Sequence, residues 1–240
     1  MLLIIDLSTL RKVVDPVRSN IQSYAGMHRY FAIDMPAMLF IRNTLLVSLV
    51  GLAGVLVPYI ALTPGFGAML GEGGPALSRF LRQVLTNGLP VVFVVNYAGF
   101  FLIALGNARA AAHRVPITAL VLDIPIRVAL FIVLHVVIYV KSADWFGSFG
   151  GSRETALRVV APTLARSAFF ENLSGVYLYA SLMCALPMHV DLIARAGWMR
   201  SKRKGIPPLA MAVFFALLWF ALSVVVLTVL AALITKWQQS

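Results

Sequence analysis

Five long apolar stretches dominate the chain, and shorter segments rich in charged and polar residues separate them. The stretches cover residues 38–62, 89–107, 117–140, 168–190 and 209–234. Each is close to, or longer than, the roughly twenty residues that an α-helix needs to cross the hydrocarbon core of a bilayer. Backbone groups in lipid have no water to bond, so these segments must be helical. The pattern therefore predicts an all-α, polytopic integral membrane helical bundle with five transmembrane helices.

The five stretches differ in polarity. The second contains Asn96, and the fourth contains Glu171 and Asn172, so these two are weaker as spans than the others. The fifth, LAMAVFFALLWFALSVVVLTVLAALI, has no charged residue. A helix that is apolar on every face must be surrounded by lipid or by the helices of another protein.

Three shorter segments carry an apolar stripe at helical spacing. The stripes are Leu77, Phe80, Leu81, Val84 and Leu85; Leu157, Val160, Ala161, Leu164 and Ala165; and Leu10, Val13, Val14, Val17, Ile21 and Tyr24. We predict short amphipathic helices that lie flat at the membrane surface, the first two in the outer headgroup layer. The third, kinked at Pro16, would lie on the cytoplasmic leaflet, although a helix that docks on a partner protein has the same pattern.

Several short phrases occur twice and predict an internal repeat. IDMPAMLF at 33–40 resembles LDIPIRVALF at 122–131, and NYAGF at 96–100 resembles NLSGV at 172–176. His113 and His189 follow the two asparagines at equal distances. The predicted organisation is a cytoplasmic amphipathic segment over 1–35, two helical-hairpin repeats over 36–115 and 116–205, and the fifth transmembrane helix within 206–240.

Composition supports a membrane protein and argues against a soluble globular protein, a cysteine-based metal site and a nucleic-acid-binding protein. Hydrophobic residues make up 60% of the chain and charged residues 12%, which lies far outside the range of soluble globular proteins. The single cysteine, Cys184, cannot form an internal disulfide or a metal-binding Cys pair. The net charge of +11 comes from basic residues near the ends of apolar stretches, which indicates membrane topology rather than nucleic-acid binding.

The basic residues also predict an orientation. Five spans place the connecting segments alternately on the two sides of the membrane. Of the 20 Lys and Arg residues, twelve then lie on the side of the N-terminus and seven on the other side, and Arg127 lies within the third stretch. By the positive-inside rule the N-terminus is cytoplasmic and the C-terminus periplasmic, in a bacterial inner membrane, and no cleavable signal is expected at MLLIID. We expect anionic lipid headgroups to bind Arg11, Lys12, Arg18, Arg200, Lys202, Arg203 and Lys204.

Asp123 and Arg127 are opposite charges one helical turn apart in the third stretch. One interpretation is an ion pair whose ends reach the membrane surface, with Pro125 in a first helical turn where its missing N–H costs little. The other is a proton- or cation-binding carboxylate with Arg127 as its counter-charge.

The remaining polar candidates are Asn96, His135, Glu171 and Asn172. Glu171 can face the outer water, pair with Arg166 or Arg158, or line a cavity with Asn96. Asn96 and Asn172 would meet near a pseudo-twofold axis or hydrogen-bond between helices, with Gly99 and Gly175 allowing close approach. His135 lies deep in a predicted span without a second histidine at matching depth, so a two-histidine haem is excluded and a single axial ligand stays open. No cofactor or metal site is predicted, because a pair of His113 and His189 would have only Asp191 as a further ligand.

No phosphate loop, HExxH or GxSxG motif is present, which makes an enzyme the least favoured class. The sparse polar chemistry favours a non-catalytic membrane subunit that packs against other integral proteins in a larger complex. The alternative is a small secondary transporter or channel whose site, between the repeats, contains Asn96, Asp123, Arg127, His135, Glu171 and Asn172. A third possibility is a membrane-remodelling or lipid-sensing protein.

Overall fold

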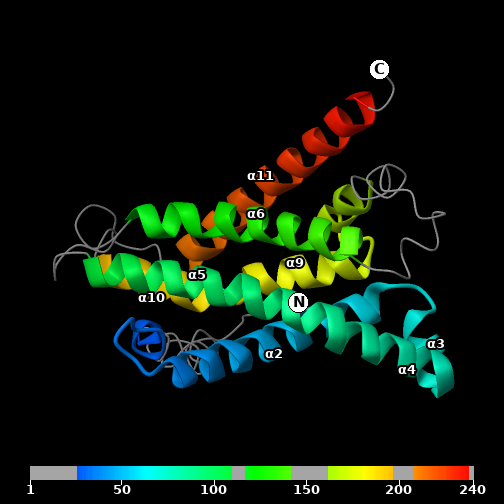
Figure 1. Cartoon of the computed structure of the whole chain (residues 1–240), viewed down its shortest axis with the longest axis horizontal. Coiled ribbons are helices and arrows are strands. Elements are labelled where there is room, and N and C mark those ends of the chain that lie inside the picture. Colours follow the sequence, from blue (N-terminus) through cyan, green and yellow to red (C-terminus); the bar gives the residue numbers. More distant parts are fainter. Residues whose placement is uncertain (1–25, 110–116, 142–161, 197–207, 238–240) are drawn as a thin grey trace, which may run out of the picture.

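The structure is a computed structural model, and it describes residues 26–109, 117–141, 162–196 and 208–237. Every regular element in these ranges is helical (Figure 1). In chain order they are η1 (Met27–Tyr30), α2 (Ala37–Leu62), α3 (Phe66–Gly71), α4 (Gly74–Gln83), the π-helical turn η2 (Val84–Gly88), α5 (Leu89–Arg109), α6 (Ile117–Lys141), a short helix over 162–168, α9 (Leu173–Met183), α10 (Leu186–Ala196) and α11 (Pro208–Trp237).

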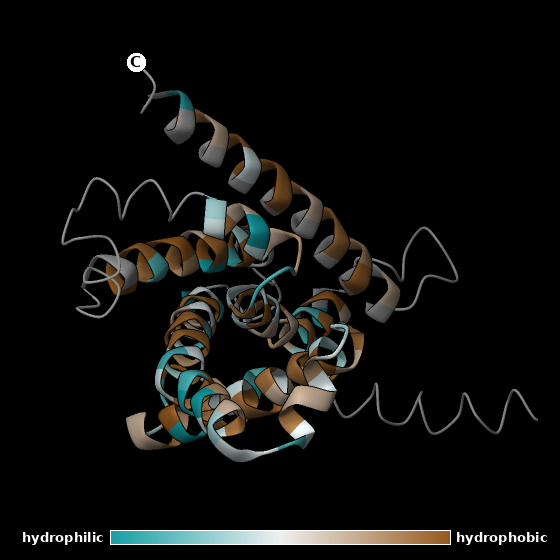
Figure 2. Ribbon diagram, turned by 90° about the vertical axis from the view of Figure 1, so that its right-hand side faces the viewer, coloured by the Kyte–Doolittle hydropathy of each residue, from teal (hydrophilic) through white to brown (hydrophobic). Residues whose placement is uncertain are grey.

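Four helical stretches within the described residues are long and apolar enough to cross a membrane. They are Ala37–Leu62, Gly74–Arg109, Val121–Ile138 and Leu173–Arg195. Figure 1 shows α3 and α4 at one end of the bundle and α10 toward the other, so the chain crosses the bundle in alternating directions. The end-on view of Figure 2 shows apolar residues along every helix, and large apolar side chains such as Met38 and Val50 are exposed. These features are those of a membrane protein.

The fifth predicted span coincides with α11, a helix of 30 residues. It contacts α10 and α6 near its start, and its C-terminal half leaves the other helices obliquely (Figures 1 and 2). A membrane crossing by α11 stays a prediction.

The first predicted surface helix is not a separate element. Residues 77–85 belong to one continuous helical run, Gly74–Arg109, that joins α4 to α5. The π turn lies just before Pro90, with Leu89 donating its backbone N–H to the Val84 carbonyl. A widened turn accommodates the ring and missing N–H of a proline without ending the helix. The asparagine and glycine before Pro90 therefore do not form a loop.

The fourth predicted span is displaced and broken. It begins at Leu173 rather than near residue 168, and it changes helix between Met183 and Leu186. Pro187 lies in the first turn of α10 and has no N–H to continue the α9 hydrogen-bond ladder, which explains the break. The break turns α10 so that His189 and Asp191 both face the protein interior, where each is nearly fully buried.

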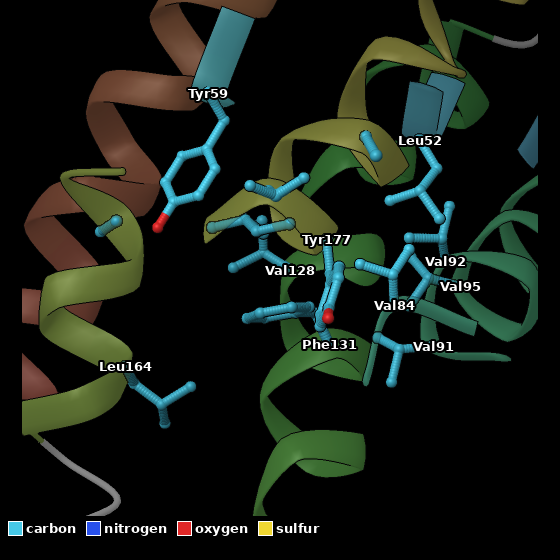
Figure 3. Close-up of a cluster of buried hydrophobic side chains, with 14 of the residues drawn as sticks. Leu52, Tyr59, Val84, Val91, Val92, Val95, Val128, Phe131, Leu164 and Tyr177 are labelled. Carbon is cyan, nitrogen blue, oxygen red and sulfur yellow. The ribbon is translucent and has the colours of Figure 1, made fainter. Parts of the chain in front are cut away.

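Two apolar clusters hold the bundle together. The larger one joins α2, α5, α6 and α9, and Figure 3 shows Val128 and Phe131 of α6 beside Tyr177 of α9. The smaller one anchors η1: Phe31 stacks on Phe100 at 4.0 Å between ring centroids and meets Phe40 edge-on at 5.5 Å. Aromatic pairs at these separations add to the energy of apolar burial.

Several predictions fall outside the described residues. These are the amphipathic segment over 7–25, most of the stripe over 157–165, His113, Arg158 and the seven headgroup-binding residues.

Candidate functional site

A group of buried polar side chains lies at the meeting point of five described helices. We call it the charge network: Ser48 of α2, Asn96 of α5, Asp123 and Arg127 of α6 and His189 of α10, together with Ser181 of α9, which takes part through its backbone carbonyl. Each of these residues is at most 3% exposed. Burying two formal charges is costly unless other polar groups replace their water. The contacts of Arg127 and Asp123 show how far the protein does this.

Arg127 is the largest fully buried side chain in the described residues. Its Nε donates to Asp123 Oδ2 at 2.8 Å, and its Nη1 donates to Asn96 Oδ1 at 2.5 Å and to the Ser181 carbonyl oxygen at 3.2 Å. The guanidinium carbon lies 4.8 Å from the centroid of the Phe100 ring, where a cation–π attraction adds to the hydrogen bonds. Arg127 thereby connects α6 to α5 and α9.

Asp123 receives a second partner from α10. His189 Nε2 lies 2.8 Å from the same Oδ2 atom that accepts from Arg127. An ionised carboxylate only accepts hydrogen bonds, so we assign the hydrogen to His189 Nε2. The contact ties α10 to α6, and Asn96 extends the network to α2 by donating its Nδ2 hydrogen to Ser48 Oγ at 2.9 Å.

Gly99 provides the space for the guanidinium group. A Cβ atom placed on Gly99 would lie 2.4 Å from Arg127 Cζ and Nη2, which is inside van der Waals contact. The absence of a side chain on α5 at this position therefore lets Arg127 lie flat against the helix backbone. This is the use of small residues at transmembrane helix contacts, applied here to a charged side chain.

The network is not fully satisfied. Within the described residues, Asp123 Oδ1 and Arg127 Nη2 have no hydrogen-bond partner. Unpaired buried polar atoms are uncommon and often mark water sites or functional groups. Chemically, the network offers one carboxylate and one imidazole that can exchange a proton, held next to a permanent positive charge.

Asp191 forms a second buried cluster two residues further along α10. Its Oδ2 accepts from the His28 backbone N–H at 2.9 Å and lies 2.8 Å from His28 Nδ1, while Arg195 Nε is 3.4 Å away. Asp191 is fully buried, whereas the His28 side chain is 31% exposed. This cluster fastens η1 to α10 and so reinforces the aromatic contacts of Phe31.

An apolar cleft of about 850 Å³ lies on the other side of α6 and α9. We call it the lateral cleft; its walls include Val55, Ile124, Phe170, Leu182, Leu217 and Val224. None of the six charge-network residues lines it. The polar and the apolar features of the molecule are therefore separate in space.

The structure brings three of the six predicted site residues together. Asn96, Asp123 and Arg127 belong to the charge network, and the predicted pairing of Asp123 with Arg127 is confirmed. The interpretation in which their ends reach the membrane surface is wrong, because Arg127 is 0% exposed. Pro125 also lies in the interior of α6 rather than in a first turn. Arg127 is buried because α5 and α9 contact it, and Pro125 is interior because α6 begins eight residues earlier, at Ile117.

The other three candidates lie apart from the network. His135 is two turns further along α6, with Nδ1 3.3 Å from the Phe131 carbonyl oxygen. Glu171 is exposed and pairs with Arg166 at 3.4 Å, one of the predicted alternatives. Asn172 caps α9, accepting from the Gly175 backbone N–H at 3.0 Å. Asn96 and Asn172 thus have different partners, and their predicted meeting does not occur.

Sequence reasoning missed His189, Ser48 and Ser181 as members of the network. The sequence indicates His189 as a marker of the repeat and as a weak metal ligand beside His113 and Asp191, but it bonds Asp123, and Asp191 bonds His28. Small hydroxyl residues such as Ser48 are common at helix contacts, and Ser181 takes part through a backbone carbonyl that any residue has, so neither stands out in the sequence. The signal for His189 was its place in an apolar stretch after a proline.

No protein-family model, curated protein or solved structure matches this chain.

Proposed function

We propose that the protein is a non-catalytic integral membrane subunit that packs within a larger membrane protein complex. The observation that carries this proposal is the separation of the charge network from the lateral cleft. A solute path needs polar groups that face an accessible cavity. Here the charged groups face neighbouring helices, and the cleft wall is apolar. The network is therefore best suited to hold helices in register.

The outer face of α2 supports an interaction with other integral proteins. Only 11% of the most apolar stretch of α2 is buried within the chain, compared with 72% for the Leu173–Arg195 stretch. Val50 and Val57 are 73% and 67% exposed. Gly54 lies between them, with no atom near enough to contact a Cβ added there. A small residue between exposed valines allows the backbone of a partner helix to approach closely.

We further propose five spans, with the N-terminus in the cytoplasm and the C-terminus outside, in a bacterial inner membrane. The length of α11, about 45 Å at 1.5 Å per residue, exceeds the roughly 30 Å hydrocarbon core. Its apolar sequence and the basic segment before it support the same assignment. Reporters fused before Met1 and after Ser240 should lie in different compartments, and reporters in one compartment would contradict it.

Assembly can be tested on α2 with the full-length protein. We expect native mass measurement in mild detergent to find the wild-type protein in a higher-mass complex. Gly54→Phe should remove that complex, because the ring blocks close approach of a partner helix. Val133→Phe is the matched control, since Val133 is also exposed (56%) but lies on α6. An unchanged mass for Gly54→Phe, or a wild-type protein that is a lone monomer with transport activity, would reject the proposal.

One observation favours the alternative, a small secondary transporter. Asp123 Oδ1 and Arg127 Nη2 are buried without partners in the described residues, as groups that receive an ion or a proton would be. In that case Asp123→Asn would abolish proton-coupled flux in proteoliposomes. Absence of flux under any gradient would leave the subunit role as the better account.

A further inference from the structure

The lateral cleft has the dimensions of a site for hydrocarbon chains. It holds about 850 Å³ between α11 and the bundle. Its α11 wall runs from Val213 to Val224, which is about 16 Å at 1.5 Å per residue. That length is close to half of the roughly 30 Å hydrocarbon core, the depth of one leaflet.

The chemistry of the wall limits what the cleft can hold. Water is a poor occupant, because apolar cavities stay dry unless polar groups hold the water. The one hydroxyl in the wall, that of Tyr179, already donates to the Ala168 carbonyl. Flexible apolar chains match the apolar wall and its length of about one leaflet.

Two charged side chains flank one end of the cleft wall. Residues 168–170 line the cleft, and Arg166 and Glu171 lie immediately before and after them. The Glu171 N–H bonds the Arg166 carbonyl and the Phe170 N–H bonds the Ser167 carbonyl, so these residues form a Schellman turn. Arg166 Nε and Glu171 Oε2 pair at 3.4 Å, and the side chains are 65% and 55% exposed, so their remaining polar atoms are able to bind further groups.

The turn is strained at the residue that lines the cleft. Phe170 has φ of 60°, and within the described residues it is the one non-glycine with a left-handed backbone. Glycine is usual at this position of the motif, and a bulky residue there is costly. The Phe170 ring packs edge-on against Tyr59 and Tyr179, at 5.2 and 5.4 Å between centroids. Strained residues held by their surroundings are typical of ligand sites.

We propose that the lateral cleft binds one membrane phospholipid with an amine-bearing, zwitterionic headgroup. Its tails fill the apolar cleft, the Arg166 guanidinium binds the phosphate, and the Glu171 carboxylate binds the ammonium group. Arginine is well suited to phosphate, and the opposite charges of the headgroup match the two side chains in sign. This inference is independent of whether the protein is a complex subunit.

Two neighbouring residues of α11 provide matched variants. Leu217 lines the cleft and is 61% exposed, whereas Leu218 is 52% exposed and does not line it. The full-length protein, purified in mild detergent, would be mixed with phosphatidylethanolamine or phosphatidylglycerol, and bound lipid measured by native mass spectrometry. We expect Leu217→Trp to lower bound phosphatidylethanolamine several-fold and Leu218→Trp to leave it unchanged. Equal binding by these two variants would overturn the cleft as the site.

The headgroup assignment has its own test. We expect the wild-type protein to prefer phosphatidylethanolamine several-fold over phosphatidylglycerol, and Glu171→Gln to remove that preference. Phe170→Gly relieves the backbone strain but deletes the ring, so it should fold and still bind less lipid. A preference that survives Glu171→Gln, or a bound peptide that Leu217→Trp displaces, would overturn the proposal.

Discussion

The charge network and the lateral cleft lie on different faces of the same two helices. On α6, Asp123 belongs to the network and its neighbour Ile124 lines the cleft; on α9, Ser181 and Leu182 divide in the same way. One residue is about 100° of helical rotation, so adjacent positions face different surroundings. Where another helix covers the face, charged groups are tolerated because protein groups replace water. Where the face borders the cleft, the side chains are apolar.

This comparison also separates two kinds of stability. The network depends on a few specific contacts, each of which leaves a buried polar atom unpaired when it is removed. The cleft depends on unspecific apolar contact, which other apolar side chains can supply. Substitutions should therefore have large effects on the network side and small effects on the cleft side.

The largest effect is expected from Arg127→Ala. It leaves the buried Asp123 carboxylate with His189 alone, and breaking a buried ion pair costs roughly 3–5 kcal/mol. Thermal unfolding in detergent would measure the loss. Asp123→Leu combined with Arg127→Met removes both charges and should recover much of the stability. A double variant no more stable than Arg127→Ala would show that the pair is not the source of the effect.

A smaller effect is expected from Gly99→Ala. The added methyl group overlaps Arg127 Cζ at 2.4 Å, and overpacking in a tight interior costs about 1–3 kcal/mol. Gly54→Ala is the control, because nothing lies within 4 Å of a Cβ there. It should be neutral or slightly stabilising, since alanine favours helix more than glycine does. Equal effects of the two substitutions on the unfolding temperature would contradict the packing of Arg127 against α5.

The smallest effect is expected from Asn172→Ala. It removes the cap of α9 near the cleft, and loss of such a cap costs about 1 kcal/mol. Asn172→Asp retains the oxygen that accepts from the Gly175 N–H but loses the Nδ2 donor to the Thr163 carbonyl, so it should recover only part of the stability. Asn96→Ala, by contrast, removes the partner of both Arg127 and Ser48. If the two alanine variants lose equal stability, the distinction between the two regions is wrong.

The sequence predicted the features that depend on local spacing. Apolar length predicted four spans that the structure supports, and the four-residue interval predicted the Asp123–Arg127 pair. The continuity of α4 with α5 was missed, because Asn87, Gly88 and Pro90 indicate a loop unless a π turn intervenes. A helical period alone does not reveal such a turn.

The contacts between distant residues could not be predicted. Asp123 and His189 are 66 positions apart, and Asn96 and Ser48 are 48 apart. Their pairing depends on how the helices are rotated about their axes, which apolar patterns specify poorly when every face is apolar. The hydrophobic sequences of α2, α5 and α6 are of this kind. The burial of Arg127 depends on the packing of α5 and α9 against α6, which the sequence of α6 does not reveal.

The most direct test of a structural charge network is its replacement by apolar side chains. The variant Asp123→Leu, Arg127→Met, His189→Leu removes every titratable group of the network, and the native mass of the protein purified from its membrane would be compared with wild type. A role in holding helices predicts a folded variant that still forms the higher-mass complex, because apolar packing can substitute for a buried ion pair. A variant that folds and assembles but loses proton-coupled or solute flux would contradict the account and assign the network to transport.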